Sequence, residues 1–133
     1  MKLGVIGSPT EHSKSPEIHT NFADQFDLEL VFEKYLVSKN ECLEWVKSFF
    51  ESGGLGLSVT LPLKEVVLEI ADDISFRAKQ AAAANMLFLK DGKIFADCTD
   101  GLGLVTDLKT KEIDIAGKKI LILGAGGAAK GIV

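Results

Sequence analysis

The residues with the most specific chemical meaning lie near the end of the chain, where an apolar run meets a cluster of glycines. The run from Leu121 to Leu123 is followed directly by Gly124, Ala125, Gly126, Gly127 and Ala128. Glycine lets a backbone turn tightly and approach a pyrophosphate, and the start of a helix supplies amide donors. A tight turn without any ligand would use the same residue types. Because the apolar run immediately precedes the glycines, we favour a dinucleotide-binding loop.

Two polar loops follow other apolar runs. In open α/β sheets, ligands bind at the carboxyl ends of the strands. This rule selects the loop from Ser8 to Ser15, which contains Ser13, and the loop from Thr60 to Lys64. If the strands before these loops are parallel, both loops lie at the same edge of the sheet.

A hairpin adds a third polar segment to this edge. Asp91-Gly92 lies between two apolar runs, which is a strong signal for a two-residue hairpin turn. Pairing of Lys90 with Lys93 would bring Asn85 opposite Cys98, and Asp100 would lie just beyond. A slip of one residue in the register would destroy this convergence.

Each of these residues also has an ordinary structural interpretation. Ser15 is expected to cap a helix whatever else it does, and Asp100 could do the same. Lys64, taken alone, would be a solvated surface lysine, and Asn85 could satisfy backbone groups at the end of a strand. Of the two histidines, His12 is expected on a loop surface and His19 in a structural role.

Apolar runs and helical periodicities alternate along the chain, which predicts an α/β fold. We expect a mostly parallel open sheet flanked by helices, with a β-hairpin, followed by the first strand of a Rossmann-type domain. The expected strands are 3–6, 30–37, 57–61, 85–89, 93–96 and 120–123. The expected helices are one beginning at 15, one from 38 to the glycines at 53 and 54, and then 64–70, 74–84 and 101–111. The domains predicted from this pattern are 1–105 and 106–133.

Two helix starts carry recognisable signals. Ser15-Pro16 places a capping residue before a proline at the first helical position, and Ile18, Phe22 and Phe26 would form one apolar face. The spacing of Ser38 and Glu41 matches a capping box.

The composition is that of an ordinary globular protein. Of its 133 residues, 47% are hydrophobic and 26% charged, and the formal net charge of −4 gives no general attraction to nucleic acid or to membranes. Cys42 and Cys98 form no C-x-x-C pair, so neither a redox motif nor a metal site is expected. The N-terminal residues do not resemble a secretory signal, and we expect a cytoplasmic protein.

Taken together, these segments resemble the shikimate dehydrogenase family. Ser13-Lys14-Ser15-Pro16 with Ile18-His19 resembles its S-K-S-P-x-I-H segment, and Val59 to Glu65 resembles its V-T-x-P-x-K-E segment. Asn85 fits its A-V-N-T strand, Thr99-Asp100-Gly101 fits N-T-D-G, and the glycine cluster fits its cofactor loop. The motifs occur in the family's order and spacing.

The resemblance implies NADP-dependent reduction of 3-dehydroshikimate to shikimate in the pathway to aromatic amino acids. It implies that Lys64 is the catalytic acid/base, with Asp100 as its partner. It further implies that Ser13 and Ser15 hold the substrate carboxylate, and that Thr60, Asn85, Lys64 and Asp100 contact the ring hydroxyls. The cofactor loop would be Gly124, Ala125, Gly126, Gly127 and Ala128.

Some positions depart from the family pattern. Ser58 and Cys98 each stand where the family usually has asparagine, Met86 replaces a threonine, and Ala84 replaces a valine. These changes keep open, as an alternative, a paralogue acting on quinate or another related cyclohexane acid. The ribose-reading residue is expected about 20 positions after the glycine motif, beyond Val133. We therefore expect the chain by itself to be an incomplete enzyme or a fragment that only binds substrate, and the protein to be a monomer or homodimer.

Overall fold

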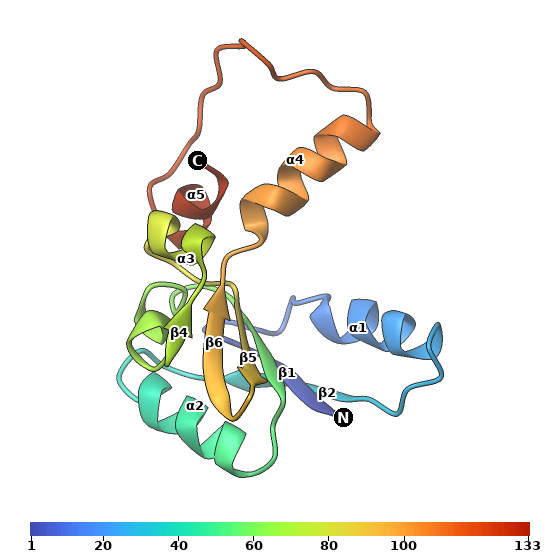
Figure 1. Ribbon diagram of the computed structural model, residues 1–133, viewed down its shortest axis with the longest axis vertical. Helices are drawn as coiled ribbons and strands as arrows, with labels where there is room; N and C mark the ends of the chain where they lie inside the picture. Colours follow the sequence, from blue (N-terminus) through green and yellow to red (C-terminus); the bar gives the residue numbers. More distant parts are fainter.

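A computed structural model describes residues 1–133 and forms an α/β fold around one six-stranded sheet (Figure 1). The strands are β1 (Lys2–Gly7), β2 (Val31–Leu36), β3 (Gly56–Val59), β4 (Asp73–Ile74), β5 (Met86–Lys90) and β6 (Lys93–Asp97). The helices are α1 (Ser15–Asp24), α2 (Cys42–Glu51), α3 (Phe76–Ala81), α4 (Asp100–Thr110) and α5 (Gly127–Ile132), with a 3₁₀ turn η1 (Val66–Glu69). No helix is long and apolar enough to span a bilayer.

The strand order is β2-β1-β3-β5-β6-β4. Strand β1 is parallel to both β2 and β3, and β4 is parallel to β6, whereas β5 runs antiparallel to β3 and β6. The predicted fold class is thus confirmed. Because β1 and β3 are parallel neighbours, the loops that follow them lie at the same edge of the sheet.

The hairpin has the register expected from its sequence. Lys90 pairs with Lys93, and the turn residues Asp91 and Gly92 both have positive φ values, of 53° and 76°. Two positive φ angles define the type I′ turn that suits the right-handed twist of a hairpin. The register continues to the other end, where the Asn85 N–H donates to the Asp97 carbonyl at 3.0 Å.

The main core lies on one face of the sheet. Alternate residues of the central strands, including Ile6, Leu57 and Leu87, are fully or almost fully buried there. The amphipathic helix α2 packs on this core with Val46 and Phe49. Helix α1 lies on the opposite face, where His19 stacks on Phe32 with ring centroids 4.6 Å apart.

Both predicted helix starts differ from the structure. The N-cap position of α1 is Lys14, and the Ser15 backbone N–H donates to Ser13 Oγ at 3.2 Å, so Ser15 is already helical. For α2 the N-cap is Glu41, and the Ser38 hydroxyl donates to the Glu41 carboxylate instead of capping a backbone N–H. In both segments the serine hydroxyl bonds to a neighbouring side chain, and the N-cap residue makes no side-chain cap hydrogen bond.

The apolar stripe predicted for α1 is present but uncovered. Ile18 and Phe22 are exposed on the helix, Phe26 is exposed just beyond its end at Asp24, and Ala23 is the one buried residue of the helix. Sequence periodicity identifies an apolar face but does not show what packs against it.

Three other predicted elements are shorter than expected or absent. The helix expected over 64–70 is reduced to the single turn η1, and Ile74 belongs to β4 instead of the helix expected over 74–84. Ile74 is held in β4 by pairing with β6, and the Asp72 N–H before it donates to the Ile94 carbonyl at 2.8 Å. The strand expected over 120–123 is not formed, since the chain contains no strand beside it to satisfy its backbone groups.

The end of the chain returns to the edge of the sheet that carries the polar loops. Helix α4 projects away from the sheet, and after an extended connection α5 lies beside α3 and the start of α4 (Figure 1). The domain boundary expected near residue 105 falls within α4. The glycine loop therefore lies near the residues at the strand ends.

Candidate active site

All six residues predicted to bind substrate line one cavity of about 420 Å³. They come from the loop after β1, the loop after β3 and the far end of the hairpin. They are Ser13, Ser15, Thr60, Lys64, Asn85 and Asp100. The convergence inferred from strand direction and hairpin register is therefore confirmed.

A close ion pair joins two of these segments. Lys64 Nζ lies 2.5 Å from Asp100 Oδ2, and the two side chains are only 14% and 25% exposed. Lys64 is held by its own backbone, since its carbonyl accepts from the Ala84 N–H at 2.7 Å. Asp100 is the first residue of α4. A lysine whose ammonium is held against a carboxylate at a cavity wall is positioned to exchange a proton with a ligand in that cavity.

Asn85 fixes the other side of the same carboxylate. Its Nδ2 donates to Asp100 Oδ1 and to Thr99 Oγ1, each at 3.0 Å. Its Oδ1 accepts from the Thr99 N–H at 2.8 Å. Asn85 therefore satisfies backbone groups, as an ordinary strand-end residue would, and also orients Asp100 in the cavity.

The two serines form a pair on the opposite segment. Ser13 Oγ and Ser15 Oγ lie 3.1 Å apart and both line the cavity. The Ser13 N–H donates to the Thr10 carbonyl at 3.0 Å, which fixes the loop that carries them. Two adjacent hydroxyls of this kind can both donate to one anionic group such as a carboxylate.

A second cavity of about 360 Å³ lies on the other side of Lys64. Gly126, Gly127 and Ala128 line it together with Lys64 and Thr60. A Cβ added at Gly126 would meet nothing within 4 Å, so the loop backbone is open to a ligand there. These residues fit the predicted dinucleotide loop, whereas Gly124 and Ala125 line a different hollow near the end of α5.

Helix α5 packs very closely against the ion pair. A Cβ added at Gly127 would lie 2.9 Å from Lys64 Cβ, and one added at Gly131 would lie 2.8 Å from Cys98 Sγ and 3.4 Å from Asp100 Oδ2. A salt bridge of 3.0 Å between Lys130 and Glu65 adds to this contact. The two glycines therefore allow the helix to approach both members of the pair.

Several residues that line the cavity were not predicted from the sequence, among them the polar residues Thr10 and His12. His12 was expected on a loop surface; it is exposed but lines the cavity, and its place beside Ser13 in a strand-end loop was the available signal. Among the departures from the family pattern, Ser58 lines the cavity, whereas Met86 lines a neighbouring apolar one. Cys98 is buried and does not line the cavity.

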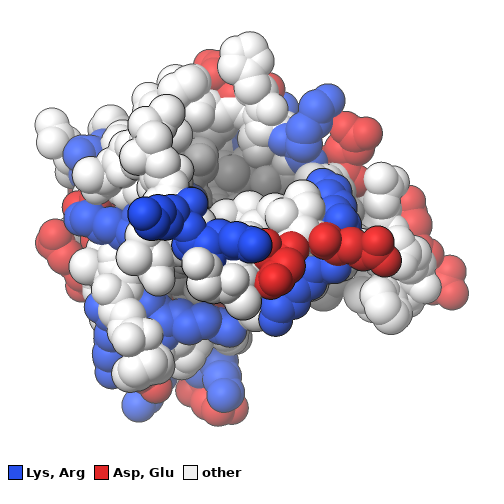
Figure 2. All heavy atoms as spheres, turned by 90° about the horizontal axis from the view of Figure 1, so that it is seen from above, with Lys and Arg blue, Asp and Glu red and all other residues white.

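Charges of both signs lie around the hollowed part of the surface. Seen from above, lysine or arginine side chains and acidic side chains lie side by side near the rim of a hollow (Figure 2). No group of three or more histidine, cysteine, aspartate or glutamate side chains could hold a metal ion.

The chain is an α/β domain with a polar cavity at the carboxyl ends of its parallel strands. The chain belongs to the shikimate dehydrogenase family, since the family model described as the shikimate dehydrogenase substrate binding domain matches residues 5–87. The resemblance seen in the sequence motifs is thereby confirmed.

Similar proteins cover almost all of this chain. A protein of Methylococcus capsulatus named shikimate dehydrogenase (NADP(+)) is 48% identical over 134 residues, which cover 99% of this chain and 48% of the relative. The crystal structure of an Ael1 enzyme from Pseudomonas putida is 38% identical, with a TM-score of 0.89 over 98% of this chain and 49% of that one.

A second solved structure contains ligands. Shikimate 5-dehydrogenase from Thermus thermophilus, in complex with NADP(H) and shikimate, is 31% identical. Its TM-score is 0.91 over 99% of this chain and 50% of that chain. The chain thus spans about half the length of the relatives that it matches.

Proposed function

We propose that the protein catalyses the NADP-dependent reduction of 3-dehydroshikimate to shikimate. The observation that carries the proposal is the position of Lys64, which lines both the cavity with the serines and the cavity with the glycine loop. In the first of these cavities Lys64 Nζ lies 2.5 Å from Asp100 Oδ2. The names of the relatives and the ligands in the Thermus thermophilus structure support it.

In the cavity, the substrate would be held at two ends. The hydroxyls of Ser13 and Ser15 would donate to the carboxylate, since charge-assisted hydrogen bonds are stronger than neutral ones. The ring oxygens would lie toward Thr60, Asn85 and the ion pair, which supply both donors and acceptors. A rigid ring with several hydroxyls is well matched to such a polar wall.

The reaction needs a hydride at the carbonyl carbon and a proton at its oxygen. NADPH, when bound, would supply the hydride, and Gly126, Gly127 and Ala128 would hold the dinucleotide beside the second cavity. Lys64 would donate the proton to the oxygen as the alcohol forms, and in the reverse direction would accept it. The Asp100 carboxylate would hold the Lys64 amino group in place both before and after the proton is transferred.

The two binding roles would belong to different parts of the chain. Residues 1–105 would form the substrate-binding part, and residues 106–133 would begin the part that binds the dinucleotide. Both cysteines are buried and unpaired, which supports a cytoplasmic location.

The test is a turnover assay of the full-length natural protein that carries this sequence. NADPH formation is followed by absorbance with shikimate and NADP, for the parent protein and for Lys64→Ala. We expect steady turnover by the parent and a loss of kcat of about 10²–10⁴-fold in the variant. A parent that does not oxidise shikimate, or a variant with near-normal kcat, would reject the proposal.

A second candidate is a paralogue that acts on quinate. It is favoured by Ser58, which lines the substrate cavity where the family usually has the longer asparagine. Comparison of kcat/KM for the two acids in the same assay separates the candidates, since the preferred substrate has the higher value. The variant Ser58→Asn should shift the ratio toward shikimate if this position sets the preference.

A further inference from the structure

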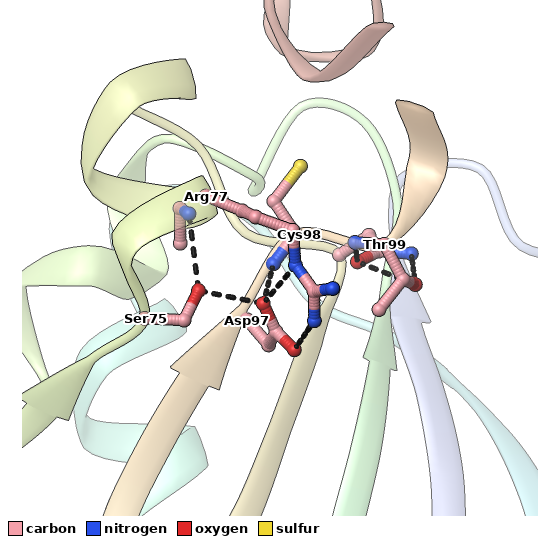
Figure 3. A network of polar contacts seen from close by, with 7 residues as sticks. Ser75, Arg77, Asp97, Cys98 and Thr99 are labelled. Atoms are coloured by element: carbon pink, nitrogen blue, oxygen red, sulfur yellow. Dashed lines mark hydrogen bonds and ion pairs between the residues drawn. The ribbon is translucent and has the colours of Figure 1, made fainter. Parts of the chain in front are cut away.

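A cluster of polar contacts at the end of β6 has no part in the chemistry proposed above (Figure 3). The Asp97 carboxylate accepts hydrogen bonds from Ser75 Oγ at 2.6 Å and from the Cys98 N–H at 2.8 Å. Arg77 binds it at two points, with Nε 3.2 Å from Oδ1 and Nη2 2.5 Å from Oδ2. Ser75 Oγ also accepts from the Ala78 N–H at 3.1 Å as the N-cap of α3. One carboxylate therefore joins the start of α3 to the end of β6.

The two partners of this ion pair differ in exposure. The Asp97 side chain is 12% exposed and that of Arg77 is 48% exposed. Burial works to raise the pKa of the Asp97 carboxyl, but hydrogen bonds from Arg77, Ser75 and Cys98 together hold that pKa below its ordinary value. An ionised carboxylate with four donors has a fixed orientation, because buried networks that are fully satisfied are rigid.

The segment that begins at Asp97 leads directly into the candidate active site. Only Cys98 and Thr99 separate Asp97 from Asp100, and neither is free to move. Cys98 is 3% exposed, and the Thr99 N–H donates to Asn85 Oδ1 at 2.8 Å. The Asn85 N–H in turn donates to the Asp97 carbonyl. The position of Asp100 therefore depends on the backbone that the Asp97 carboxylate fixes.

We propose that Arg77, acting through Asp97, is a positioning residue for the Lys64–Asp100 pair. The inference rests on the proposed function. Arg77 itself lines neither of the two cavities beside Lys64. Its two-point contact fixes the orientation of the Asp97 carboxylate, and the Cys98 N–H donates to Oδ1 of the same carboxylate. Without the guanidinium, the segment before α4 gains freedom and Asp100 spends less time against Lys64.

The experiment compares Arg77→Ala with Lys79→Ala in the full-length natural protein. Lys79 lies on the same helix, is exposed, and makes no side-chain contact with the cluster. We expect Arg77→Ala to lower kcat for shikimate oxidation by about 10-fold, since small misplacements of catalytic groups are costly. KM should change much less, because the serine loop is untouched. Lys79→Ala should match the parent in both parameters.

Rescue distinguishes positioning from a general loss of structure. Guanidinium, at concentrations that do not unfold the protein, can enter the exposed space left by Arg77→Ala. We expect it to raise the kcat of Arg77→Ala several-fold and to leave the kcat of Lys79→Ala unchanged. Rates are expressed per folded molecule, measured by circular dichroism. If Arg77→Ala does not fold, Arg77→Lys takes its place, since lysine keeps the charge but cannot make the two-point contact. Arg77→Lys is expected to show the same loss of kcat.

Three results would overturn the inference: an unchanged kcat per folded molecule, a loss confined to KM, or a loss of kcat that guanidinium does not restore in Arg77→Ala. Failure of the proposed function looks different, because the parent itself would then not oxidise shikimate. In that case crystal structures of the parent and Arg77→Ala decide the positioning role. The Asp100–Lys64 contact should be lost in the variant, and its retention would overturn the inference.

Discussion

Replacement of Gly127 by alanine tests whether the close approach of α5 to the ion pair matters. The added Cβ would lie 2.9 Å from Lys64 Cβ, whereas carbon atoms in contact are normally about 3.5–4.0 Å apart. Neither atom is at the end of a flexible side chain, so the backbone of α5 or of the Lys64 loop must move by roughly 0.6–1.1 Å. We expect Lys64 to be displaced relative to the substrate.

The magnitude follows from two opposing effects on stability. Overpacking of a close contact costs about 1–3 kcal/mol. Replacement of glycine by alanine at a compatible position gains about 0.4–1 kcal/mol, because the unfolded chain loses freedom. The net loss for Gly127→Ala should be about 1–2 kcal/mol. A displacement of this size should also lower kcat by about 10- to 100-fold.

Gly103→Ala is the matched control. It is the same substitution in helix α4, where an added Cβ would meet nothing within 4 Å. We expect it to be neutral or stabilising, with kcat unchanged. The assays are urea unfolding and shikimate oxidation by the full-length natural protein. Equal stability and equal kcat for the two variants would refute the argument that glycine is needed for contact between α5 and Lys64.

Three further predictions concern the candidate active site and α1. Combining Lys64→Ala with Asp100→Asn should cost less in kcat than the two separate losses added together, because the residues act as a unit; additive losses would argue against one catalytic pair. Replacing Ser13 and Ser15 by alanine should weaken binding of shikimate by roughly 1.5–3 kcal/mol per hydroxyl, and should weaken binding of an analogue with a neutral amide in place of the carboxylate much less. Equal losses for the two ligands in titration calorimetry would exclude binding of the carboxylate by the two serines. Burial lowers the pKa of His19 below 6.5, so the unfolded state binds the proton more readily and stability falls as pH drops below 6.5. His19→Phe should remove this part of the pH dependence, measured as unfolding temperature between neutral and mildly acidic pH, and an unchanged profile would contradict it.

The parts of the site that follow from sequence are those fixed by topology. Parallel strands bring Ser13 and Lys64 to one edge, and a two-residue turn fixes the hairpin register that brings Asn85 to Asp100. Both rules act on the backbone, so they hold without knowledge of the side-chain packing. The resemblance to a family added the roles of these residues, which remain predictions.

The parts that sequence did not predict depend on side chains that compete for partners. Ser38 matched a capping signal, but its hydroxyl bonds to Glu41 instead. The helix expected over 74–84 begins later, at Phe76, because Asp73 and Ile74 pair with β6 and the Asp72 carboxylate accepts from the Ile94 N–H at 2.8 Å. The cluster around Asp97 joins residues from two elements that no local pattern connects. Which partner each of these groups binds depends on the free energy of the whole fold and not on the residue spacing within one segment.

The geometry around Asp100 explains why one short segment must be rigid. Its carboxylate oxygens bind two different groups, Lys64 through Oδ2 and Asn85 through Oδ1. A carboxylate can satisfy both at once only in one orientation, and that orientation is set by the backbone between Asp97 and the start of α4. The same backbone is packed on by Gly131 of α5, whose added Cβ would meet Cys98 Sγ at 2.8 Å. Freedom in this segment would therefore change both the Lys64–Asp100 ion pair and the packing of α5 against it. This is the physical reason to expect coupling between the two cavities.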